Sequence, residues 1–285
     1  MTYRIEALLS ARLFLRPEVV DEKIYFLSNI SGHNSLYVMA RKGSVPKPLL
    51  PPNIVLQNPH LIGGKSFAVL KDLGKILVMI DKDGDENYLP MMIPITGGFP
   101  APAFNNFFEN TRCHLGHVDT KKNLCFMMAE SREEGIERTY LCHLDSGDVK
   151  ELYASPYGGY PAAFTEDYSR IVLIQGYAVG DTVAYLWEDG QEIRTLYGKP
   201  LAEREEDEEV TLASFGAGFF TDDDQGLVIA NALHKDTYGL GYLSIENPDE
   251  IIDVPFEGLV HSGVGEFDGL DVLDNGRYLL EFNID

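Results

Sequence analysis

The chain has 285 residues, of which 45% are hydrophobic, and it carries 23 Lys and Arg against 45 Asp and Glu, for a formal net charge of -22 at pH 7. A chain of this length and apolar content can bury a sizeable core as one large or two ordinary domains, and its composition does not indicate intrinsic disorder. Its negative field repels phosphate backbones and anionic lipid surfaces, so we expect neither nucleic acid nor membrane as a partner.

Targeting and redox features point to the cytoplasm. No stretch reaches the roughly 18 uninterrupted apolar residues that a membrane-spanning helix needs. The start, MTYRIEALLSARLF, lacks the basic region, apolar core and small-residue cleavage site of a signal peptide. Three cysteines do not make a disulfide framework, which agrees with a reducing compartment.

Six copies of one pattern follow each other along the chain. In each, an acidic turn leads into an apolar strand, a polar loop and, in most, a second apolar or aromatic strand. The residue before the first apolar run recurs about every fifty residues, a period typical of propeller repeats. These marker residues are Lys23, Lys75, Asn123, Arg170, Gly226 and Arg277.

The second copy, KILVMIDKDGDENYLPMM from Lys75 to Met92, shows the pattern most clearly. An apolar run, Ile76 to Ile80, is followed by a polar turn and a second run from Tyr88 to Ile93. The Asp83-Gly84 pair supplies the positive φ angles of a tight hairpin. A lone hairpin is only marginally stable, so the pattern predicts a strand pair within a larger sheet.

Each copy has a weaker strand ahead of its acidic turn, and most have another behind. We expect the leading strands at 13–15, 66–70, 112–118, 160–164, 215–220 and 265–272, and the trailing strands at 46–50, 149–153, 192–197 and 250–254. Four short strands per unit, with Gly and Asp turns between them, predict a propeller blade.

The predicted fold is therefore all-β: a β-propeller of four-stranded antiparallel blades, with five complete repeats, a partial sixth and an open or incomplete ring. We expect one domain over 1–285, with repeats near 11–50, 58–103, 111–153, 160–197, 212–254 and 262–285. An α/β fold would need helices between its strands, and only 3–12 and 201–209 have a helical pattern. An immunoglobulin-like sandwich would lack the long repeat.

The repeats resemble those in the propellers of prolyl-oligopeptidase-like serine peptidases, in the acylaminoacyl-peptidase and dipeptidyl-peptidase branch, and in the Tol translocation system. The resemblance is carried by GGYPAAFTEDYSRIVLI from Gly158, NSLYVMARKGSVPKPLL from Asn34 and DKDGDENYLPMM from Asp81. No copy keeps the full Ser-Pro-Asp-Gly turn of those repeats. The motifs cover nearly the whole chain but are short, so they indicate fold more strongly than activity.

The sequence has no Gly-X-Ser-X-Gly nucleophile elbow, the motif that holds the catalytic serine of those peptidases. His261-Ser262-Gly263 lacks the second spaced glycine, and we interpret it as a turn. The sixth repeat stops after its second strand, and two open edges would forgo about five to ten backbone hydrogen bonds of roughly 1 kcal/mol each. We therefore expect an open ring or, preferably, a fragment that lacks an α/β-hydrolase domain.

Two metal hypotheses are weaker than their structural alternatives. Asp81, Asp83 and Asp85 alternate like calcium ligands, but Glu86 and Met92 stand where an EF-hand needs glycine and an acid, which favours a solvated hairpin. The third repeat gathers Cys113, His114, His117, Cys125, Cys142 and His143. Regular alternation places Cys113 and His117 on one strand face and His114 on the other, so we expect buried structural cysteines, no metal and no cofactor.

The acidic run EREEDEE, 203–209, is interpreted as a solvated loop or short acidic helix, or as a contact for a basic partner. Inner-strand polar residues that could line a channel are His60, Arg112, Tyr160 and Glu266. No catalytic residue is assigned. The resemblance implies a non-catalytic propeller that restricts peptide access to a hydrolase domain of the same parent protein. The alternatives are a free-standing propeller that binds a protein or small ligand and, more weakly, a lyase or lactonase.

Overall fold

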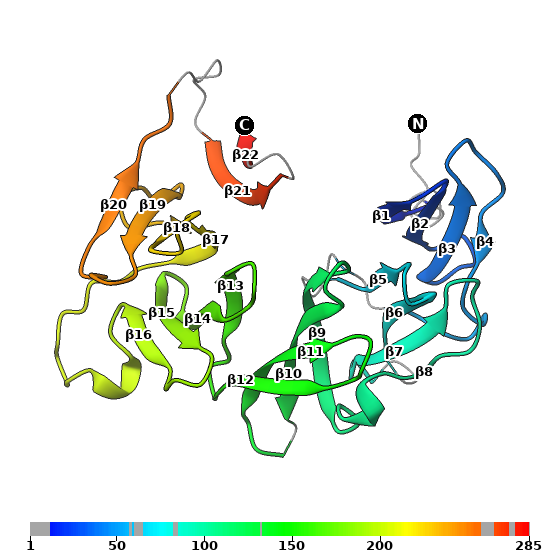
Figure 1. Ribbon diagram of the computed structural model, residues 1–285, viewed down its shortest axis with the longest axis horizontal. Coiled ribbons are helices and arrows are strands. Elements are labelled where there is room, and N and C mark those ends of the chain that lie inside the picture. Colours follow the sequence, from blue (N-terminus) through cyan, green and yellow to red (C-terminus); the bar gives the residue numbers. More distant parts are fainter. Residues whose placement is uncertain are drawn as a thin grey trace, which may run out of the picture. The chain divides into compact units, whose positions relative to one another are not determined.

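The computed structural model describes residues 12–56, 59, 65–81, 85–131, 133–257, 265–273 and 277–284. The chain divides into two compact units, unit 1 (Met1–Pro156) and unit 2 (Tyr157–Asp285). The strands of each unit are labelled in Figure 1. In the part of the chain that is described, no helix is long and apolar enough to cross a membrane.

Unit 1 contains three four-stranded antiparallel sheets, each with its strands in chain order. The first holds β1 (Phe14–Val20), β2 (Lys23–Ser28), β3 (Ser35–Ala40) and β4 (Lys47–Pro48). The second holds β5 (Phe67–Leu70), β6 (Lys75–Ile80), β7 (Leu89–Pro94) and β8 (Ala101–Pro102). The third holds β9 (Thr111–Asp119), β10 (Leu124–Ser131), β11 (Glu137–His143) and β12 (Val149–Ser155).

Unit 2 contains two more four-stranded antiparallel sheets and one of two strands. The fourth sheet holds β13 (Tyr160–Phe164), β14 (Arg170–Ala178), β15 (Asp181–Glu188) and β16 (Arg194–Tyr197). The fifth holds β17 (Phe215–Phe220), β18 (Gly226–Asn231), β19 (Gly239–Ser244) and β20 (Ile251–Val254). The sixth pairs β21 (Gly265–Val272) with β22 (Tyr278–Ile284).

These sheets confirm the predicted fold class, with five four-stranded antiparallel blades and a two-stranded sixth. Two 3-10 turns, Phe104–Asn106 and Leu201–Glu203, lie between the strands, and the isolated described residue Pro59 is also helical. The helical pattern expected at 201–209 therefore ends after one turn, while 1–11 lie outside the described residues. The closure of the ring and the assignment of a single domain stay predictions.

Strand β6 shows why the second repeat is apolar without interruption. Ile76 and Val78 point into one hydrophobic cluster, with the first sheet, and Leu77 and Met79 into another, with the third sheet. Alternate side chains of a strand leave opposite faces, so a sheet with neighbours on both faces buries every residue of its middle strand. Its partner β7 continues the hairpin, and Ile80 pairs with Leu89 next to the turn. The predicted Asp83-Gly84 tip lies outside the described residues.

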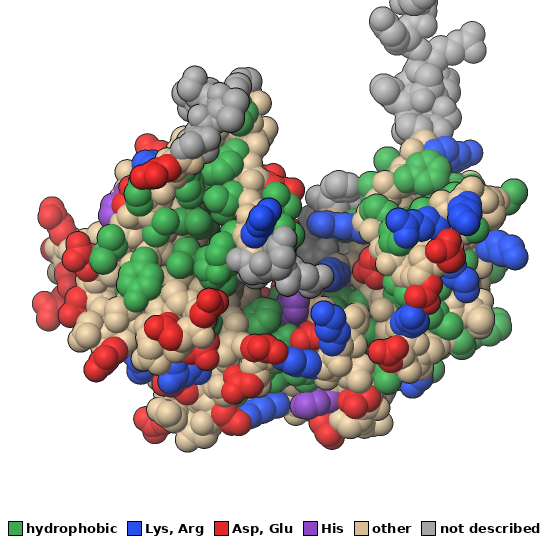
Figure 2. All heavy atoms as spheres, turned by 45° about the horizontal axis from the view of Figure 1, so that its top comes forward, with side chains coloured by type: hydrophobic (Ala, Val, Ile, Leu, Met, Phe, Trp, Pro, Cys, Tyr) green, Lys and Arg blue, Asp and Glu red, His purple; other side chains and the backbone are tan. Residues whose placement is uncertain are grey.

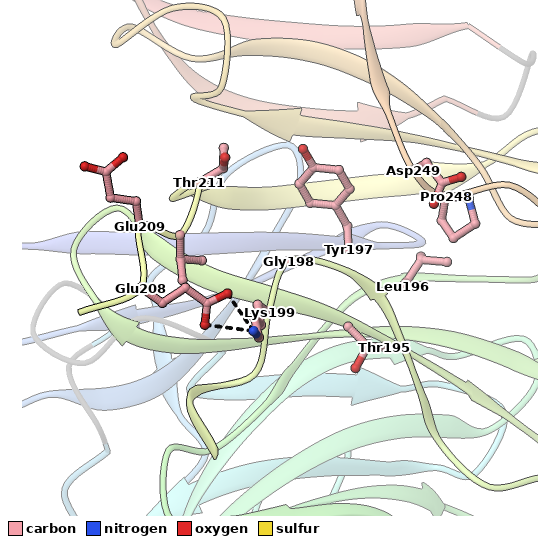
Figure 3. Close-up of a pocket in the computed structure, with 11 residues that line it drawn as sticks. Thr195, Leu196, Tyr197, Gly198, Lys199, Glu208, Glu209, Thr211, Pro248 and Asp249 are labelled. Carbon is pink, nitrogen blue, oxygen red and sulfur yellow. Dashed lines mark hydrogen bonds and ion pairs between the residues drawn. The ribbon is translucent and has the colours of Figure 1, made fainter. Parts of the chain in front are cut away.

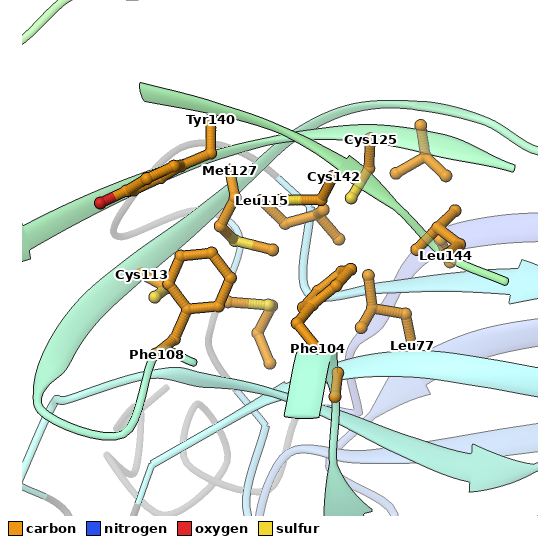
Figure 4. Close-up of a cluster of buried hydrophobic side chains, with 14 of the residues drawn as sticks. Leu77, Phe104, Phe108, Cys113, Leu115, Cys125, Met127, Tyr140, Cys142 and Leu144 are labelled. Carbon is orange, nitrogen blue, oxygen red and sulfur yellow. The ribbon is translucent and has the colours of Figure 1, made fainter. Parts of the chain in front are cut away.

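The hydrophobic cluster that the second and third sheets share is rich in aromatic and sulfur-containing side chains (Figure 4). Phe108 packs edge-on against Phe104 and Tyr140, with ring centroids 5.7 and 5.4 Å apart. Strand β8, which is absent from the predicted trailing strands, forms an edge of the second sheet. The sequence did not indicate β8, because a proline is atypical of strands. Pro102 has no N–H to donate to a neighbouring strand, which restricts proline to edge strands such as this one.

Candidate functional site

The channel residues expected from the sequence fall in different units. Arg112 lies on β9 of unit 1, whereas Tyr160 on β13 and Glu266 on β21 belong to unit 2. All three are on the first strand of a sheet, and Glu266 is exposed. His60 lies outside the described residues. That these four residues line one channel stays a prediction.

Arg112 is loosely held. Its cross-strand partner on β10 is Glu130, and Arg112 Nη1 lies 4.0 Å from Glu130 Oε2. The other carboxylate oxygen of Glu130 lies 3.4 Å from His114 Nε2. Arg112 Nε is buried and has no hydrogen-bond partner among the described residues. A guanidinium has five N–H donors, and among the described residues the ion-pair contact of Arg112 with Glu130 is a long one.

A second polar group of unit 1 joins all three of its sheets. Glu18 on β1 accepts a hydrogen bond from the Val69 N–H of β5, 3.0 Å away. Burial raises the pKa of Glu18, opposed by that bond and by the charge of Lys65. The Lys65 N–H donates to Leu115 O of β9, 3.1 Å away. The pKa of His117, also on β9, is lowered by desolvation from the surrounding protein and then by the charge of Lys65, although the residue as a whole is exposed.

The sequence pattern did not predict this polar group, because its position depends on irregular pairing in two strands, β1 and β9. The β1–β2 register shifts between Leu15 and Glu18, and Arg16 has φ 49°. Pro17 follows, and a proline inside a strand signal is the one sequence mark of such a bulge. A bulge moves later side chains to the other face, which brings Glu18 to β5. Titratable groups with shifted pKa values are frequent at functional sites, but ion-pair networks shift them as well.

The same kind of irregularity corrects the predicted faces of β9. The β9–β10 register shifts between Cys125 and Met127, so Val118 rather than His117 is buried beside Leu115. Cys113 and His117 therefore do not share a face. All three cysteines are buried in the hydrophobic cluster of Figure 4. Within the described ranges, no group of three or more His, Cys, Asp or Glu could hold a metal ion.

Tyr160 joins two neighbouring strands of unit 2. Its hydroxyl donates to the Phe215 carbonyl oxygen of β17, 2.7 Å away. Burial, followed by the nearby Tyr238, raises the pKa of Tyr160 to about 12. The residue as a whole is still 40% exposed. The polar end of this side chain is thus used within the fold, and only its aromatic face is available to a ligand.

Unit 2 also contains a pocket of about 510 Å³ at the end of β16 (Figure 3). Three segments line it: 195–199, which ends β16, 208–211 from the acidic loop, and 248–249 from the turn before β20. Tyr197 stands between Glu209 and Thr211 on one side and Asp249 on the other. Lys199 Nζ lies 2.6 and 2.7 Å from the two carboxylate oxygens of Glu208.

The acidic loop that borders this pocket is anchored rather than freely solvated. Arg204 donates from Nη1 and Nη2 to the two oxygens of Asp181, each 2.7 Å away, and from Nε to Lys199 O, 3.0 Å away. Its guanidinium lies 5.1 Å from the centre of the Tyr177 ring. The Tyr177 hydroxyl accepts a bond from the Leu201 N–H, 3.1 Å away. The loop is therefore a fixed wall of the pocket.

Comparison with known proteins shows the fold at low sequence identity. No family model and no curated protein sequence matches the chain. A prolyl endopeptidase structure matches with a TM-score of 0.62 at 9% identity and covers 96% of this chain and 40% of that chain. A puromycin-hydrolyzing peptidase of Mycobacterium tuberculosis gives a TM-score of 0.62 at 13% identity, and the match covers 95% of this chain and 43% of that chain.

These matches confirm the predicted resemblance to the propellers of prolyl-oligopeptidase-like peptidases. The chain spans only about 40% of the length of these peptidases. An oligogalacturonate lyase in complex with manganese also matches, with a TM-score of 0.52 at 14% identity, and covers 81% of this chain and 61% of that chain. Proteins of different activities thus share this fold, and activity has to be argued from sites.

Proposed function

We propose that the chain is a non-catalytic propeller of a serine peptidase of the prolyl-oligopeptidase type. In this role it restricts which peptides reach an α/β-hydrolase domain of the same parent protein. The observation that carries the proposal is the fold match, in which nearly all of this chain, 96%, corresponds to 40% of a prolyl endopeptidase. Its partners would be that hydrolase domain and short peptide substrates, and its location the cytoplasm.

The residues of the chain support a selecting rather than a reacting role. The sequence has no Gly-X-Ser-X-Gly elbow, and the serine beside glycine at 262 lies outside the described residues. Two polar groups involve first strands of the sheets: Arg112 on β9 lies 4.0 Å from Glu130 of β10, and Glu18 on β1 accepts a backbone hydrogen bond from Val69. Such groups can orient a peptide by its charges and amides, which is how selective binding sites discriminate.

The test begins with the reading frame beyond codon 285. The proposal expects it to continue into a Gly-X-Ser-X-Gly domain, and a stop codon directly after Asp285 would contradict it. The purified 285-residue chain should not cleave acylated or unblocked peptide anilides. Turnover that disappears in an Arg112→Ala variant would refute the non-catalytic assignment. The full protein should cleave short peptides and leave unfolded long polypeptides intact.

The main alternative is a free-standing propeller that binds a protein or a small ligand. The fixed pocket of unit 2 favours it, because this pocket does not depend on any catalytic domain. A stop codon after Asp285 together with specific ligand binding would select this alternative. A lyase is the weaker alternative, suggested by the oligogalacturonate lyase match. Formation of unsaturated product from oligogalacturonate with manganese, absent without the protein, would select it.

A further inference from the structure

Unit 1 has a pocket of about 540 Å³ where the hydrophobic cluster between its second and third sheets reaches the surface. Buried side chains of that cluster line the pocket, among them Phe104 and Leu144, which lie next to Leu77 at one side of the cluster (Figure 4). Met92, which pairs with Leu77 across β6 and β7, packs against the same cluster and also lines the pocket. The floor of the pocket is therefore apolar, as is usual for sites of small ligands.

An exposed aromatic side chain borders this pocket. Phe99 is part of the lining and is 83% exposed. Its loop is fixed by two backbone hydrogen bonds, from Gly97 N–H to Pro94 O, 2.8 Å, and from Gly98 N–H to Leu49 O, 2.9 Å. Strand β8 begins two residues later. An aromatic ring that is held in solvent beside an apolar pocket gains contact area when a ligand covers it.

A strained turn forms another part of the wall. Phe104, Asn105 and Asn106 have φ angles of 50°, 53° and 65°, in the left-handed region that is costly for residues other than glycine. Gly147, in the turn between β11 and β12, packs closely against it, because a Cβ at Gly147 would lie 3.2 Å from Asn105 Nδ2. Backbone strain that the surrounding fold maintains is frequent at ligand sites.

The lining includes one ionisable side chain of each sign, Lys75 and Asp145. Lys75 lies two residues before Leu77 on β6, so its side chain leaves the face of the strand that turns to the cluster. Lys75 is exposed, and it forms no ion pair with any residue that the structure describes. Asp145 accepts a hydrogen bond from Ser146 N–H, 2.8 Å away. Lys75 is therefore the charge of the pocket that a ligand can pair with.

The charge of unit 1 permits an anionic group at this place. Residues 1–156 contain 17 Lys and Arg and 18 Asp and Glu, a net charge of -1, whereas residues 157–285 contain 6 and 27, a net charge of -21. In the view of Figure 2, blue side chains are frequent over β1–β4 of unit 1 and few over the strands of unit 2. The field of unit 2 repels a carboxylate, while that of unit 1 is close to neutral.

We propose that this pocket of unit 1 binds a small molecule that carries an aromatic ring and a carboxylate. The ring lies on the apolar floor beside Phe99 and Phe104, and the carboxylate pairs with the ammonium of Lys75. The volume of about 540 Å³ is within the range of small-ligand pockets, about 300–1,000 Å³. A free aromatic acid and a short peptide with an aromatic C-terminal residue share this chemistry. The proposal does not depend on the peptidase function, because the second and third sheets and their loops build the whole pocket.

The test measures binding of 3-phenylpropionate and of the dipeptide Ala-Phe to the 285-residue chain by calorimetry. Two comparison molecules each lack one feature: 3-phenylpropanamide has no charge, and propionate has no ring. Both ring-bearing carboxylates should bind, with the amide about twofold weaker, because an exposed ion pair contributes little. Propionate should show no measurable binding. Tighter binding of Ala-Phe than of 3-phenylpropionate would identify a peptide as the source of the ligand, and the reverse order a free acid.

Variants at the two ligand contacts have matched controls in unit 1. Phe99→Ala should weaken binding of 3-phenylpropionate about fivefold, because it removes an aromatic partner. Lys75→Met should weaken it about twofold and leave the affinity for 3-phenylpropanamide unchanged, because only the acid is charged. The controls Phe14→Ala and Lys42→Met change exposed residues outside the pocket and should leave both affinities unchanged.

Thermal unfolding of each variant shows whether it is folded. Phe99→Leu, which keeps an apolar side chain without the ring, provides a second test of the aromatic contact and should weaken binding of 3-phenylpropionate about threefold. Absence of 3-phenylpropionate binding at millimolar concentration would overturn the proposal. So would propionate binding as tightly as 3-phenylpropionate, equal losses in the pocket and control variants, or a Lys75→Met variant that weakens binding of the amide as much as that of the acid.

Discussion

Arg204 and Asp181 form a two-pronged ion pair in which both hydrogen bonds are 2.7 Å long and both side chains are 86% covered by the fold. The two residues are 23 positions apart, one in the acidic loop and one at the start of β15. Planar guanidinium and carboxylate groups bond in this geometry with a defined orientation. The pair fixes a loop whose seven residues 203–209 otherwise include six acids.

Loss of this pair should destabilise unit 2. Arg204→Met leaves the largely covered Asp181 carboxylate without its partner, and we expect the free energy of unfolding to fall by about 1–2 kcal/mol at pH 7. The double variant Arg204→Met/Asp181→Asn should recover part of the loss, because it removes the unpaired charge. Urea unfolding of the four proteins of this double-mutant cycle measures the coupling. Additive effects of the two substitutions would contradict the assigned role.

The same pair predicts a pH dependence. The hydrogen bonds from Arg204 lower the pKa of Asp181. A carboxyl whose pKa is lower in the folded state stabilises the fold above its unfolded pKa, about 3.9, and this stabilisation is lost as the pH falls through the lower folded value. The stability difference between the wild type and Arg204→Met should therefore shrink below about pH 4. An unchanged difference at pH 2.5 would contradict the ionic contribution.

Glu18 should show the opposite sign. Burial raises the pKa of Glu18, so its contribution to stability is complete below the unfolded pKa of about 4.3 and is lost as the pH rises through the folded value. Glu18→Gln keeps an oxygen that accepts from Val69 and removes the charge. We expect this variant to be as stable as the wild type at pH 4 and equally or more stable, by up to about 1 kcal/mol, at pH 7.

A control variant isolates the hydrogen bond of Glu18. Glu18→Leu removes the acceptor and leaves the Val69 N–H without this bond, which should cost about 1–3 kcal/mol at both pH values. Urea unfolding at pH 4 and pH 7 compares the three proteins. If Glu18→Gln were clearly less stable than the wild type at pH 7 only, the ionised carboxylate would be stabilising and the assigned burial effect would be wrong.

Much of the architecture could be predicted from the sequence, because blades with neighbours on both faces need uninterrupted apolar middle strands such as β6. The polar sites could not. The position of Glu18 depends on a bulge at Arg16-Pro17, and a shift of one residue reverses every later side chain. The bulge in β9 moved His117 off the core face for the same reason. The anchoring of the acidic loop depends on a pair 23 residues apart that no local pattern indicates.

Gly97 and Gly43 form a matched pair for testing a backbone contact of unit 1. Both have φ in the left-handed region, 88° and 98°, where a side chain costs about 1 kcal/mol. A Cβ at Gly97 would lie 2.8 Å from Leu49 O and 2.9 Å from Leu49 Cα, whereas one at Gly43 would have nothing within 4 Å. Gly97→Ala should lower the free energy of unfolding by about 3 kcal/mol and Gly43→Ala by about 1 kcal/mol. Equal losses in urea unfolding would show that the Leu49 contact is not constraining.

The three cysteines should be unreactive in the folded protein. Burial raises the pKa of Cys113 to about 12, and the pKa of Cys142 is raised by its hydrogen bond with Cys125 and by burial. The thiolate is the reactive form, so iodoacetamide at pH 8 should modify none of the three within an hour and all three in 8 M urea, as counted by mass spectrometry. The raised pKa values of Cys113 and Cys142 also predict that stability falls as the pH rises above about 8.5, the pKa of an unfolded thiol, because folding then holds these two thiols protonated. Rapid labelling of one thiol in the native protein would show that the hydrophobic cluster opens, or that this thiol lies outside it.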